Sequence, residues 1–251
     1  MYAAGLTAVG LVREHNEDAI RYTMEPVGPL PNLFIVADGM GGHNAGEVAS
    51  QKSVEFFYDF VCNAAHTAFL KPDDILSFML EATHTANQKV YEYAAQSPDF
   101  RGMGTTFSAC TILNNSMIYT HIGDSRIYAI SPGHITRVTL DHTFVEELVK
   151  QGSLTPEQAK THPRRNQLTR VLGCDPDVFA DGAIFDISHV DSILLCSDGL
   201  SDMVPQEAVL KLVSLNVTTD ARVQALIDTA NNQGGIDNIS AIIIDVKGEA
   251  H

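Results

Sequence analysis

Short runs rich in β-branched, leucine and aromatic residues recur along the chain, each bounded by Gly, Asn, Asp or Pro. Such runs are typical of β-strands. We expect strands over residues 33–37, 107–113, 118–122, 126–130, 134–138, 192–196 and 240–246. The connections at Asn114-Asn115, Gly123-Asp124 and Pro132-Gly133 are too short to hold a crossover helix. Consecutive strands in this part of the chain are therefore expected to pair antiparallel.

Two long stretches, residues 45–65 and 73–95, instead place apolar side chains three or four positions apart, which predicts amphipathic helices. Pro72 and the acidic pair Asp73 and Asp74 fit the start of the second helix. Two further helices are expected over 206–215 and 220–231. Because strands and helices come in separate blocks, the order favours an α+β fold, with two antiparallel sheets flanked by helices, over a doubly wound parallel sheet.

Composition describes a folded, acidic chain. Of its 251 residues, 45% are hydrophobic and 19% charged, and the formal net charge is −15. No internal repeat or linker divides the sequence, so we expect a single domain over residues 1–251. The negative charge disfavours binding to nucleic acid or to anionic membranes, and bound divalent cations are one way to offset it.

The four cysteines form no Cys-x-x-Cys pair, and we expect four free, mostly buried thiols. No window reaches the ~18 to 20 uninterrupted apolar residues of a membrane span, and the N-terminal residues lack a leader pattern. We expect a cytoplasmic protein without membrane association, and a monomer.

Four acidic residues stand where apolar strands end or begin, each beside glycine or a small polar residue: Asp38, Asp124, Asp198 and Asp237. Hard cations such as Mg²⁺ and Mn²⁺ prefer carboxylate and carbonyl oxygens. A single Asp-Gly pair is most often only a turn. Clustered without a cation, however, such acids would raise one another's pKa values. The pattern therefore makes a metal site the hypothesis to test.

The chain carries, in order, the segments Arg13-Glu-His-Asn-Glu17-Asp18, Val36-Ala-Asp38-Gly39-Met40-Gly-Gly-His43, Gly102-Met-Gly-Thr-Thr106, Gly123-Asp124-Ser-Arg126, Cys196-Ser-Asp198-Gly-Leu200 and Gly235-Ile-Asp237-Asn238-Ile-Ser240. Together they resemble the bacterial branch of the metal-dependent type 2C protein serine/threonine phosphatases, the PPM family. The resemblance runs from about residue 6 to residue 246. It implies a four-layer α-β-β-α sandwich whose two central antiparallel sheets hold two Mn²⁺ or Mg²⁺ ions at one edge.

By this resemblance the ligands are the Asp38 carboxylate, bridging both ions, the Gly39 carbonyl, and Asp198 and Asp237. Asp124, together with Asp198, corresponds to the position that binds a third, weaker ion. Glu17 and Asp18 would hold metal-bound waters and support the ligands, and Asn238 would also support them.

The resemblance further implies a protein phosphatase that hydrolyses phosphoserine and phosphothreonine monoesters by direct attack of a metal-bridging water or hydroxide. Arg13 matches the arginine that binds the substrate phosphate, a task suited to its planar fork; without the motif it would be an arginine in a surface ion pair. The expected partners are phosphorylated proteins, among them a bacterial serine/threonine kinase and its substrates.

The proton donor for the leaving oxygen stays open. Eukaryotic relatives have a histidine directly after the Asp-Gly pair, whereas here Met40 takes that place and the histidine comes at His43. His43 could donate the proton, contact substrate or cap the helix that begins near residue 45.

Residues 141–170, here called the flap, gather basic residues in an acidic chain: Lys150, Lys160, Arg164, Arg165 and Arg170, with His142 and His162. They surround two short helical stretches and correspond to the family's flap beside the active site. The flap either steers phosphopeptides to the metals or is an ordinary solvated surface.

Two rival functions remain. A two-metal phosphodiesterase is disfavoured by the net charge, although a small cyclic diester would still fit. A non-catalytic pseudophosphatase that only recognises phosphoproteins would have no chemical need for Arg13, Asp38, Asp198 and Asp237 together. The protein phosphatase is the favoured reading.

Overall fold

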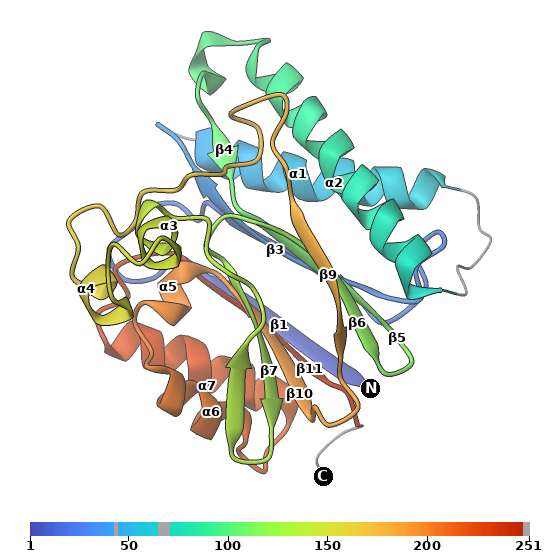
Figure 1. The fold of residues 1–251 in the computed structure, drawn as a ribbon, viewed down its shortest axis with the longest axis vertical. Coiled ribbons are helices and arrows are strands. Elements are labelled where there is room, and N and C mark those ends of the chain that lie inside the picture. The colour runs from blue at the N-terminus through green and yellow to red at the C-terminus, as the bar shows by residue number, and fades with distance from the viewer. Residues whose placement is uncertain (43–44, 65–70, 248–251) are drawn as a thin grey trace.

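The computed structural model describes residues 1–42, 45–64 and 71–247, and it contains two β-sheets stacked face to face between two layers of helices (Figure 1). The first sheet has the strand order β1 (Tyr2–Ala8), β11 (Ile239–Asp245), β10 (Ser192–Cys196), β7 (Arg126–Ser131) and β8 (His134–Arg137). Chain ends that are far apart in sequence therefore meet in one sheet, since β1 pairs with β11 along its whole length.

The second sheet has the order β2 (Asp18–Thr23), β3 (Leu33–Met40), β5 (Phe107–Leu113), β6 (Ser116–Ile122) and β9 (Asp181–Asp186), and the two-residue strand β4 (Gly104–Thr105) pairs with the end of β3. All strand pairs of the described residues are antiparallel. The prediction of two antiparallel central sheets is confirmed.

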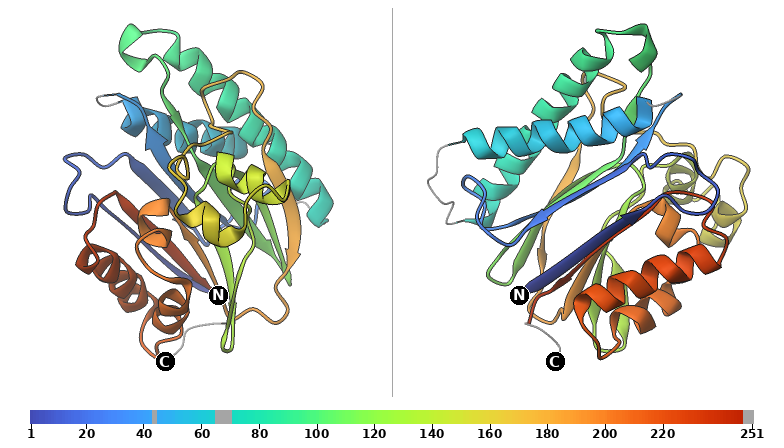
Figure 2. Two further views of the ribbon diagram at one scale, coloured as in Figure 1. Left: turned by 60° about the vertical axis from the view of Figure 1, so that its left-hand side comes forward. Right: turned by 180° about the vertical axis from the view of Figure 1, so that it is seen from behind.

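Helices α1 (Ala45–Asn63) and α2 (Pro72–Ala94) cover the second sheet, and α6 (Gln206–Val213) and α7 (Thr219–Asn232) cover the first (Figure 2). A 3-10 turn, η1 (Pro98–Phe100), follows α2. The one-turn helix α5 (Asp198–Ser201) follows β10 directly. The flap holds α3 (Phe144–Lys150) and α4 (Pro156–Lys160), which begin at the capping residues Thr143 and Thr155.

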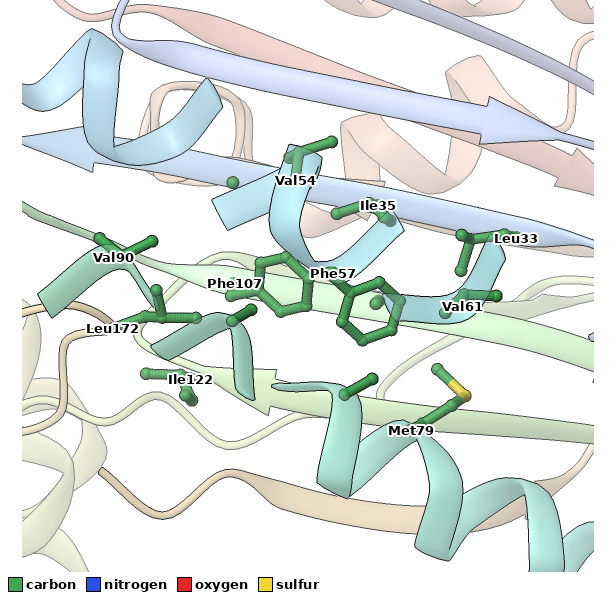
Figure 3. Close-up of a cluster of buried hydrophobic side chains, with 14 of the residues drawn as sticks. Leu33, Ile35, Val54, Phe57, Val61, Met79, Val90, Phe107, Ile122 and Leu172 are labelled. Carbon is green, nitrogen blue, oxygen red and sulfur yellow. The ribbon is translucent and has the colours of Figure 1, made fainter. Parts of the chain in front are cut away.

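Three buried hydrophobic clusters fill the spaces between the four layers. Phe57, Met79 and Phe107 belong to the cluster between α1, α2 and the second sheet, which Figure 3 shows. A second cluster lies under α6 and α7, and a third lies between the sheets. Successive side chains of β3 point to opposite faces of the sheet and so belong to two of these clusters. Leu33 and Ile35 face the helices, while Phe34 faces the other sheet. This is the expected four-layer α-β-β-α sandwich.

The patterned strands and long helices occur within two residues of their predicted bounds wherever the structure describes them, except that β3 ends at Met40, three residues beyond its predicted end. Four strands without a pattern were missed: β1, β2, β9 and the two-residue β4. One expectation is wrong. The Gly123-Asp124 connection does not join paired strands, because β6 lies in the second sheet and β7 in the first. The chain changes sheets there, and this carries Asp124 to the edge that the sheets share.

All four cysteines are free. Cys110 and Cys196 are buried, Cys62 is half-buried and Cys174 is exposed, so the expectation of mostly buried thiols is met fully by only two of them. Among the described helices, none has the length and apolar content needed to cross a bilayer.

Candidate metal centre

Asp38 is held in the middle of the site by its backbone. Its N–H donates to Thr106 Oγ1 at 3.0 Å, and its carbonyl accepts from the Thr106 N–H at 2.8 Å and from Thr105 Oγ1 at 2.9 Å. Strand β3 runs on to Met40 because β4 pairs with Gly39 and Met40, so Asp38 lies inside the strand and not just beyond its predicted end at residue 37. The two threonines come from the Gly102–Thr106 segment, whose role the sequence did not reveal.

The glycines after Asp38 and Asp198 are required by close backbone approach. A Cβ on Gly39 would lie 2.0 Å from the Gly46 carbonyl oxygen, and one on Gly199 would lie 1.9 Å from the Asn238 carbonyl oxygen. Neither glycine has a positive φ. Gly39 belongs to β3 and Gly199 to α5, so the reading of these two Asp-Gly pairs as simple turns is wrong.

Asp198 and Asp237 approach Asp38 from the first sheet. Asp198 begins α5 immediately after β10, and Asp237 precedes β11. After burial, the negative charge of Asp198 is among the causes that raise the pKa of Asp38, so the two carboxyl groups lie near each other. Two ionised carboxyl groups placed in this way repel each other unless a proton or a cation lies between them.

Arg13 reaches the same edge from the loop after β1. Its Nη2 donates to Asp237 Oδ2 at 2.8 Å, and its Nη1 lies 4.0 Å from Glu17 Oε2. The side chain keeps 46% of its surface exposed. A guanidinium that is bonded through one terminal nitrogen and stays about half exposed can still bind an anion through its other N–H groups.

Asp18 lies opposite Asp38 in the β2–β3 register and is buried. Its Oδ2 accepts from Ser197 Oγ at 2.8 Å and from Ser240 Oγ at 2.6 Å, while its Oδ1 is buried without a hydrogen-bond partner. Burial raises the pKa of Asp18 to about 7, and the two serine hydroxyls oppose that rise. Glu17 Oε1 is likewise buried without a partner, and burial raises the pKa of Glu17.

Asn238 ties the N-terminal loop to this edge. Its Oδ1 accepts from the Glu17 N–H at 2.8 Å, and its Nδ2 donates to the carbonyls of Val9 and His15, both at 2.9 Å. Because Asn238 follows Asp237, one short segment supplies a candidate ligand and also fixes the loop that carries Arg13 and Glu17.

Asp124 faces Asp198 from the turn between the sheets. Burial raises the pKa of Asp124 well above its usual value, and the charges of Asp198 and Asp141 raise it further. Arg126 opposes that rise, but its guanidinium is committed to Asp141 at 2.7 Å. Asp202, one helical turn beyond Asp198, also adds negative charge here, and sequence reasoning missed it.

Two further carboxyl groups at this edge have raised pKa values. Burial raises the pKa of Asp38 well above its usual value, with repulsion from Asp18 and Asp198 adding to it. Burial raises the pKa of Asp198 to about 6, and Asp202 and Asp237 contribute. Among the described residues, no three His, Cys, Asp or Glu side chains already converge closely enough to hold an ion. The carboxylates fit Mn²⁺ or Mg²⁺ by donor type, and Asp18 and Glu17 each have a buried oxygen without a partner among the described residues.

A pocket of about 740 Å³ opens beside the carboxylates, between the flap and helices α5 and α6. Asp124, Asp198 and Asp237 line one side, and Lys160 and Arg165 of the flap line another. Figure 1 places α3 and α4 next to α5, in agreement with this lining.

The flap arginines are not equivalent. Arg164 packs over the Phe144 ring at 3.7 Å and donates to Gln167 at 2.6 Å, so it serves the flap's own structure. Of the two, Arg165 is the one that lines the pocket.

The structure thus brings Arg13, Glu17, Asp18, Asp38, Gly39, Asp124, Asp198, Asp237 and Asn238 to one edge. His43 lies outside the described residues. The unpredicted participants Ser197 and Ser240 bind Asp18 and stood inside the quoted motifs, but nothing in their spacing indicated a shared partner.

Comparison with known proteins finds the same fold and sequence signature. The family model described as protein phosphatase 2C matches residues 12–233. The serine/threonine phosphatase stp of Listeria innocua is 35% identical over 245 residues, which are 98% of this chain and 96% of that protein. The crystal structure of serine/threonine phosphatase Stp1 from Staphylococcus aureus matches with a TM-score of 0.90 and 32% identity, covering 98% of this chain and 95% of that chain. The catalytic domain of the phosphatase PstP in complex with two manganese ions matches with a TM-score of 0.82 and 33% identity over 97% of both chains.

Proposed function

The chain belongs to the protein phosphatase 2C family as a bacterial-type serine/threonine phosphatase, and from that premise we propose that the carboxylate edge is its catalytic centre. The substrates are phosphoserine and phosphothreonine monoesters in phosphorylated proteins. The observation that carries the proposal is the cluster of Asp18, Asp38, Asp124 and Asp198, whose burial and mutual repulsion raise their pKa values beside an exposed arginine. Such a cluster is stable at neutral pH only with cations or protons among its members.

The family is metal-dependent, and we assign two Mn²⁺ or Mg²⁺ ions to Asp38, the Gly39 carbonyl, Asp198 and Asp237. A third, weaker ion is assigned to Asp124 together with Asp198. When bound, such ions lower the pKa of a water molecule and offset the charge of the phosphate it attacks.

The protein's own groups have separate tasks. The Arg13 guanidinium holds phosphate oxygens, and Asp237 orients it through the 2.8 Å hydrogen bond that Nη2 donates to Oδ2. Asp18, fixed by Ser197 and Ser240, keeps one oxygen without a partner among the described residues and supports the ligands. Glu17, which also has one such oxygen, supports them from the loop that Asn238 fixes.

Proton donation to the leaving oxygen is assigned to His43 on its place in the sequence, two residues before α1 begins at Ala45. A serine or threonine alkoxide is a poor leaving group, and an imidazole near neutral pKa suits its protonation.

The rival functions are less well supported by this arrangement. A binding-only pseudophosphatase does not need a buried carboxylate cluster that is costly to keep ionised. A phosphodiesterase acting on nucleic acid would have to overcome the net charge of −15.

Several finer assignments belong to the same proposal. We place the protein in the cytoplasm as a monomer with one catalytic domain over residues 1–251, in which residues 141–170 form the flap. Its partners would be a serine/threonine kinase and the proteins that this kinase phosphorylates.

The test is hydrolysis of a phosphothreonine peptide with Mn²⁺, with EDTA, and by Asp198→Ala in Mn²⁺. Activity only in the first sample is expected, since one lost electrostatic contact often costs ~10² to 10³ in rate. Asp228→Ala, an exposed change on α7, is the matched control and should stay active. Peptide binding without hydrolysis in wild type would favour the pseudophosphatase, and turnover of a simple diester alone would favour the phosphodiesterase.

A further inference from the structure

Two buried histidines lie where the flap joins the second sheet. His121 and His142 are 1% and 3% exposed, and their ring centroids are 4.9 Å apart. Neither residue touches the proposed ligands, and the proposed mechanism uses neither. Their hydrogen bonds nevertheless reach the turn that carries Asp124.

The contacts of His142 define its tautomer. The Gly123 N–H donates to His142 Nδ1 at 3.1 Å, so Nδ1 carries no proton. A neutral ring with Nδ1 as acceptor carries its proton on Nε2, which donates to Asp181 Oδ2 at 3.1 Å, so Arg170 Nη1, 3.3 Å from Nε2, forms no hydrogen bond with it. Arg170 donates to the other oxygen of Asp181 at 2.6 Å. One imidazole thus connects the Gly123 turn with β9.

His121 is fixed in the same form. Its Nε2 donates to the Leu140 carbonyl at 3.1 Å, and its Nδ1 accepts from the Ser108 hydroxyl at 2.9 Å. Burial lowers the pKa of His121 to about 4 and also lowers that of His142, so both rings stay neutral at pH 7. Each ring then offers one donor and one acceptor, and each is used.

The start of the flap meets the Gly123 turn, and the end of the flap meets His142. The His142 N–H donates to the Gly123 carbonyl at 2.8 Å, and the His142 carbonyl accepts from the Thr169 N–H at 2.8 Å. On its other side Gly123 packs so tightly that a Cβ would lie 2.6 Å from the Thr106 side chain. The turn is therefore held between Thr106, which fixes Asp38, and His142, which fixes the flap.

We propose that His142, supported by His121, is a positioning residue that sets Asp124 at the centre and couples that position to both ends of the flap. This inference rests on the proposed function only in taking Asp124 as an ion ligand. A side chain that fixes a metal ligand typically changes metal affinity 10- to 100-fold when it is removed.

Two substitutions separate the two halves of the contact. In His142→Asn the amide oxygen can take the place of Nδ1 and accept from Gly123. In His142→Gln the amide nitrogen can take the place of Nε2 and donate to Asp181, but nothing replaces Nδ1. Both variants lose the ring, so a general loss of packing affects them alike.

The first readout is amide hydrogen exchange in the metal-free full chain. The Gly123 amide should exchange ~10-fold faster in His142→Gln than in His142→Asn, since ~1.4 kcal/mol corresponds to a factor of ten and one hydrogen bond is worth about that much. Equal exchange in the two variants would overturn the proposal.

The second readout is Mn²⁺ binding by calorimetry. The weakest ion should bind ~10-fold more weakly to His142→Gln and within ~3-fold of wild type to His142→Asn, with the tighter ions unchanged. Wild-type affinity in His142→Gln would overturn the coupling to Asp124. Asp124→Ala is the reference: if it leaves all Mn²⁺ binding unchanged, the assignment of Asp124 fails, while the Gly123 exchange still decides whether His142 holds the turn.

A different observation concerns the rim beside Arg13. Leu11, Val12 and Ile236 are 69%, 64% and 57% exposed, which is high for large apolar side chains. Their two loops are joined, since the Leu11 N–H donates to the Gly235 carbonyl at 2.7 Å and Arg13 donates to Asp237. These three side chains, here called the collar, are therefore carried by the same two joined loops that hold Arg13 and Asp237.

We infer that the collar binds an apolar residue adjacent to the phosphorylated residue of a substrate protein. An extended peptide advances ~3.3 Å per residue. When the phosphate of a bound peptide lies at Arg13, the peptide residues on either side of the phosphorylated one are therefore within reach of collar residues such as Leu11, which is two positions from Arg13 in the chain. In a chain of net charge −15, an uncharged rim also avoids repelling a phosphopeptide. This inference rests on the proposed function and adds a substrate class to it.

The test compares two phosphothreonine peptides, one with leucine and one with serine on both sides of the phosphothreonine. Wild type should prefer the leucine peptide ~10-fold in kcat/KM, because one apolar contact of this kind is worth ~1 to 3 kcal/mol. The Leu11→Ser and Ile236→Ser double variant should lose the preference yet hydrolyse p-nitrophenyl phosphate like wild type. Leu215→Ser, a 43% exposed apolar residue after α6, is the matched control and should keep the preference.

Equal kcat/KM for the two peptides in wild type, or a preference that survives in the double variant, would overturn the proposal that the collar binds an apolar residue of the substrate. A wild-type protein that hydrolyses neither peptide nor p-nitrophenyl phosphate would contradict the proposed function instead.

Discussion

Replacing Asp18 by asparagine should stabilise the metal-free protein at alkaline pH. The pKa of Asp18 is raised by burial to about 7 from an ordinary 3.8, and each pKa unit corresponds to ~1.4 kcal/mol, so ionising this carboxyl group in the fold costs up to ~4 kcal/mol at pH 8. In Asp18→Asn the amide oxygen can still accept from Ser197 and Ser240, while the NH₂ group takes the place of the oxygen that lacks a partner. Burying that NH₂ group costs part of this gain, so we expect the free energy of unfolding at pH 8 to increase by ~2 to 3 kcal/mol.

The stability gained in Asp18→Asn should increase as the pH rises. A carboxyl group with a raised pKa costs nothing while it is protonated in both states, and the cost grows as pH rises from about 4 through 7. Urea unfolding in EDTA should therefore give no gain for Asp18→Asn at pH 4 and the full gain at pH 8. At ~2 to 4 °C per kcal/mol, the Tm at pH 8 should rise by ~5 to 10 °C. A gain of the same size at both pH values, or a loss at pH 8, would refute the reasoning.

Three further predictions concern catalysis. Arg13→Lys keeps the charge but loses the fork, so KM for a phosphopeptide should rise ~10-fold with kcat also reduced; unchanged kinetics would remove Arg13 from the phosphate site. Gly199→Ala should lower activity and Tm together, because its Cβ would lie 1.9 Å from the Asn238 carbonyl oxygen. Gly42→Ala should have little effect on Tm, because apart from its chain neighbours no atom of the described residues comes within 4 Å of a Cβ at that position. Arg165→Ala should raise KM for phosphopeptides ~3- to 10-fold without changing hydrolysis of p-nitrophenyl phosphate; identical phosphopeptide KM values would make the flap an ordinary surface.

Most of the fold is visible in the sequence because its buried elements are strongly patterned. Strands such as β5 and β10 are almost wholly buried, and α1 and α2 each have one apolar face. Strand β1 could not be recognised, since a stretch rich in alanine and glycine has little β-propensity and becomes a strand through its pairing with β11. The change of sheet at Gly123 was also hidden, because a short turn looks the same whether the next strand pairs with the last or leaves it.

The acids of the site were predictable, and their surroundings were not. Asp38 and Asp198 follow apolar runs of the sequence and precede glycines, a pattern that a single sequence can display. The partners of Asp18, by contrast, are Ser197 and Ser240, which are 179 and 222 residues away in the chain. Only the stacking of the two sheets brings these serines to it, and the same holds for His142 and Gly123 at the foot of the flap.

The most direct test of the proposed centre is anomalous diffraction at the manganese edge from crystals of the wild-type protein grown with Mn²⁺. Two strong peaks contacting Asp38, with Asp198 and Asp237 beside them and a weaker peak at Asp124, are the predicted result. Peaks elsewhere on the acidic surface, or none at this edge at saturating Mn²⁺, would contradict it.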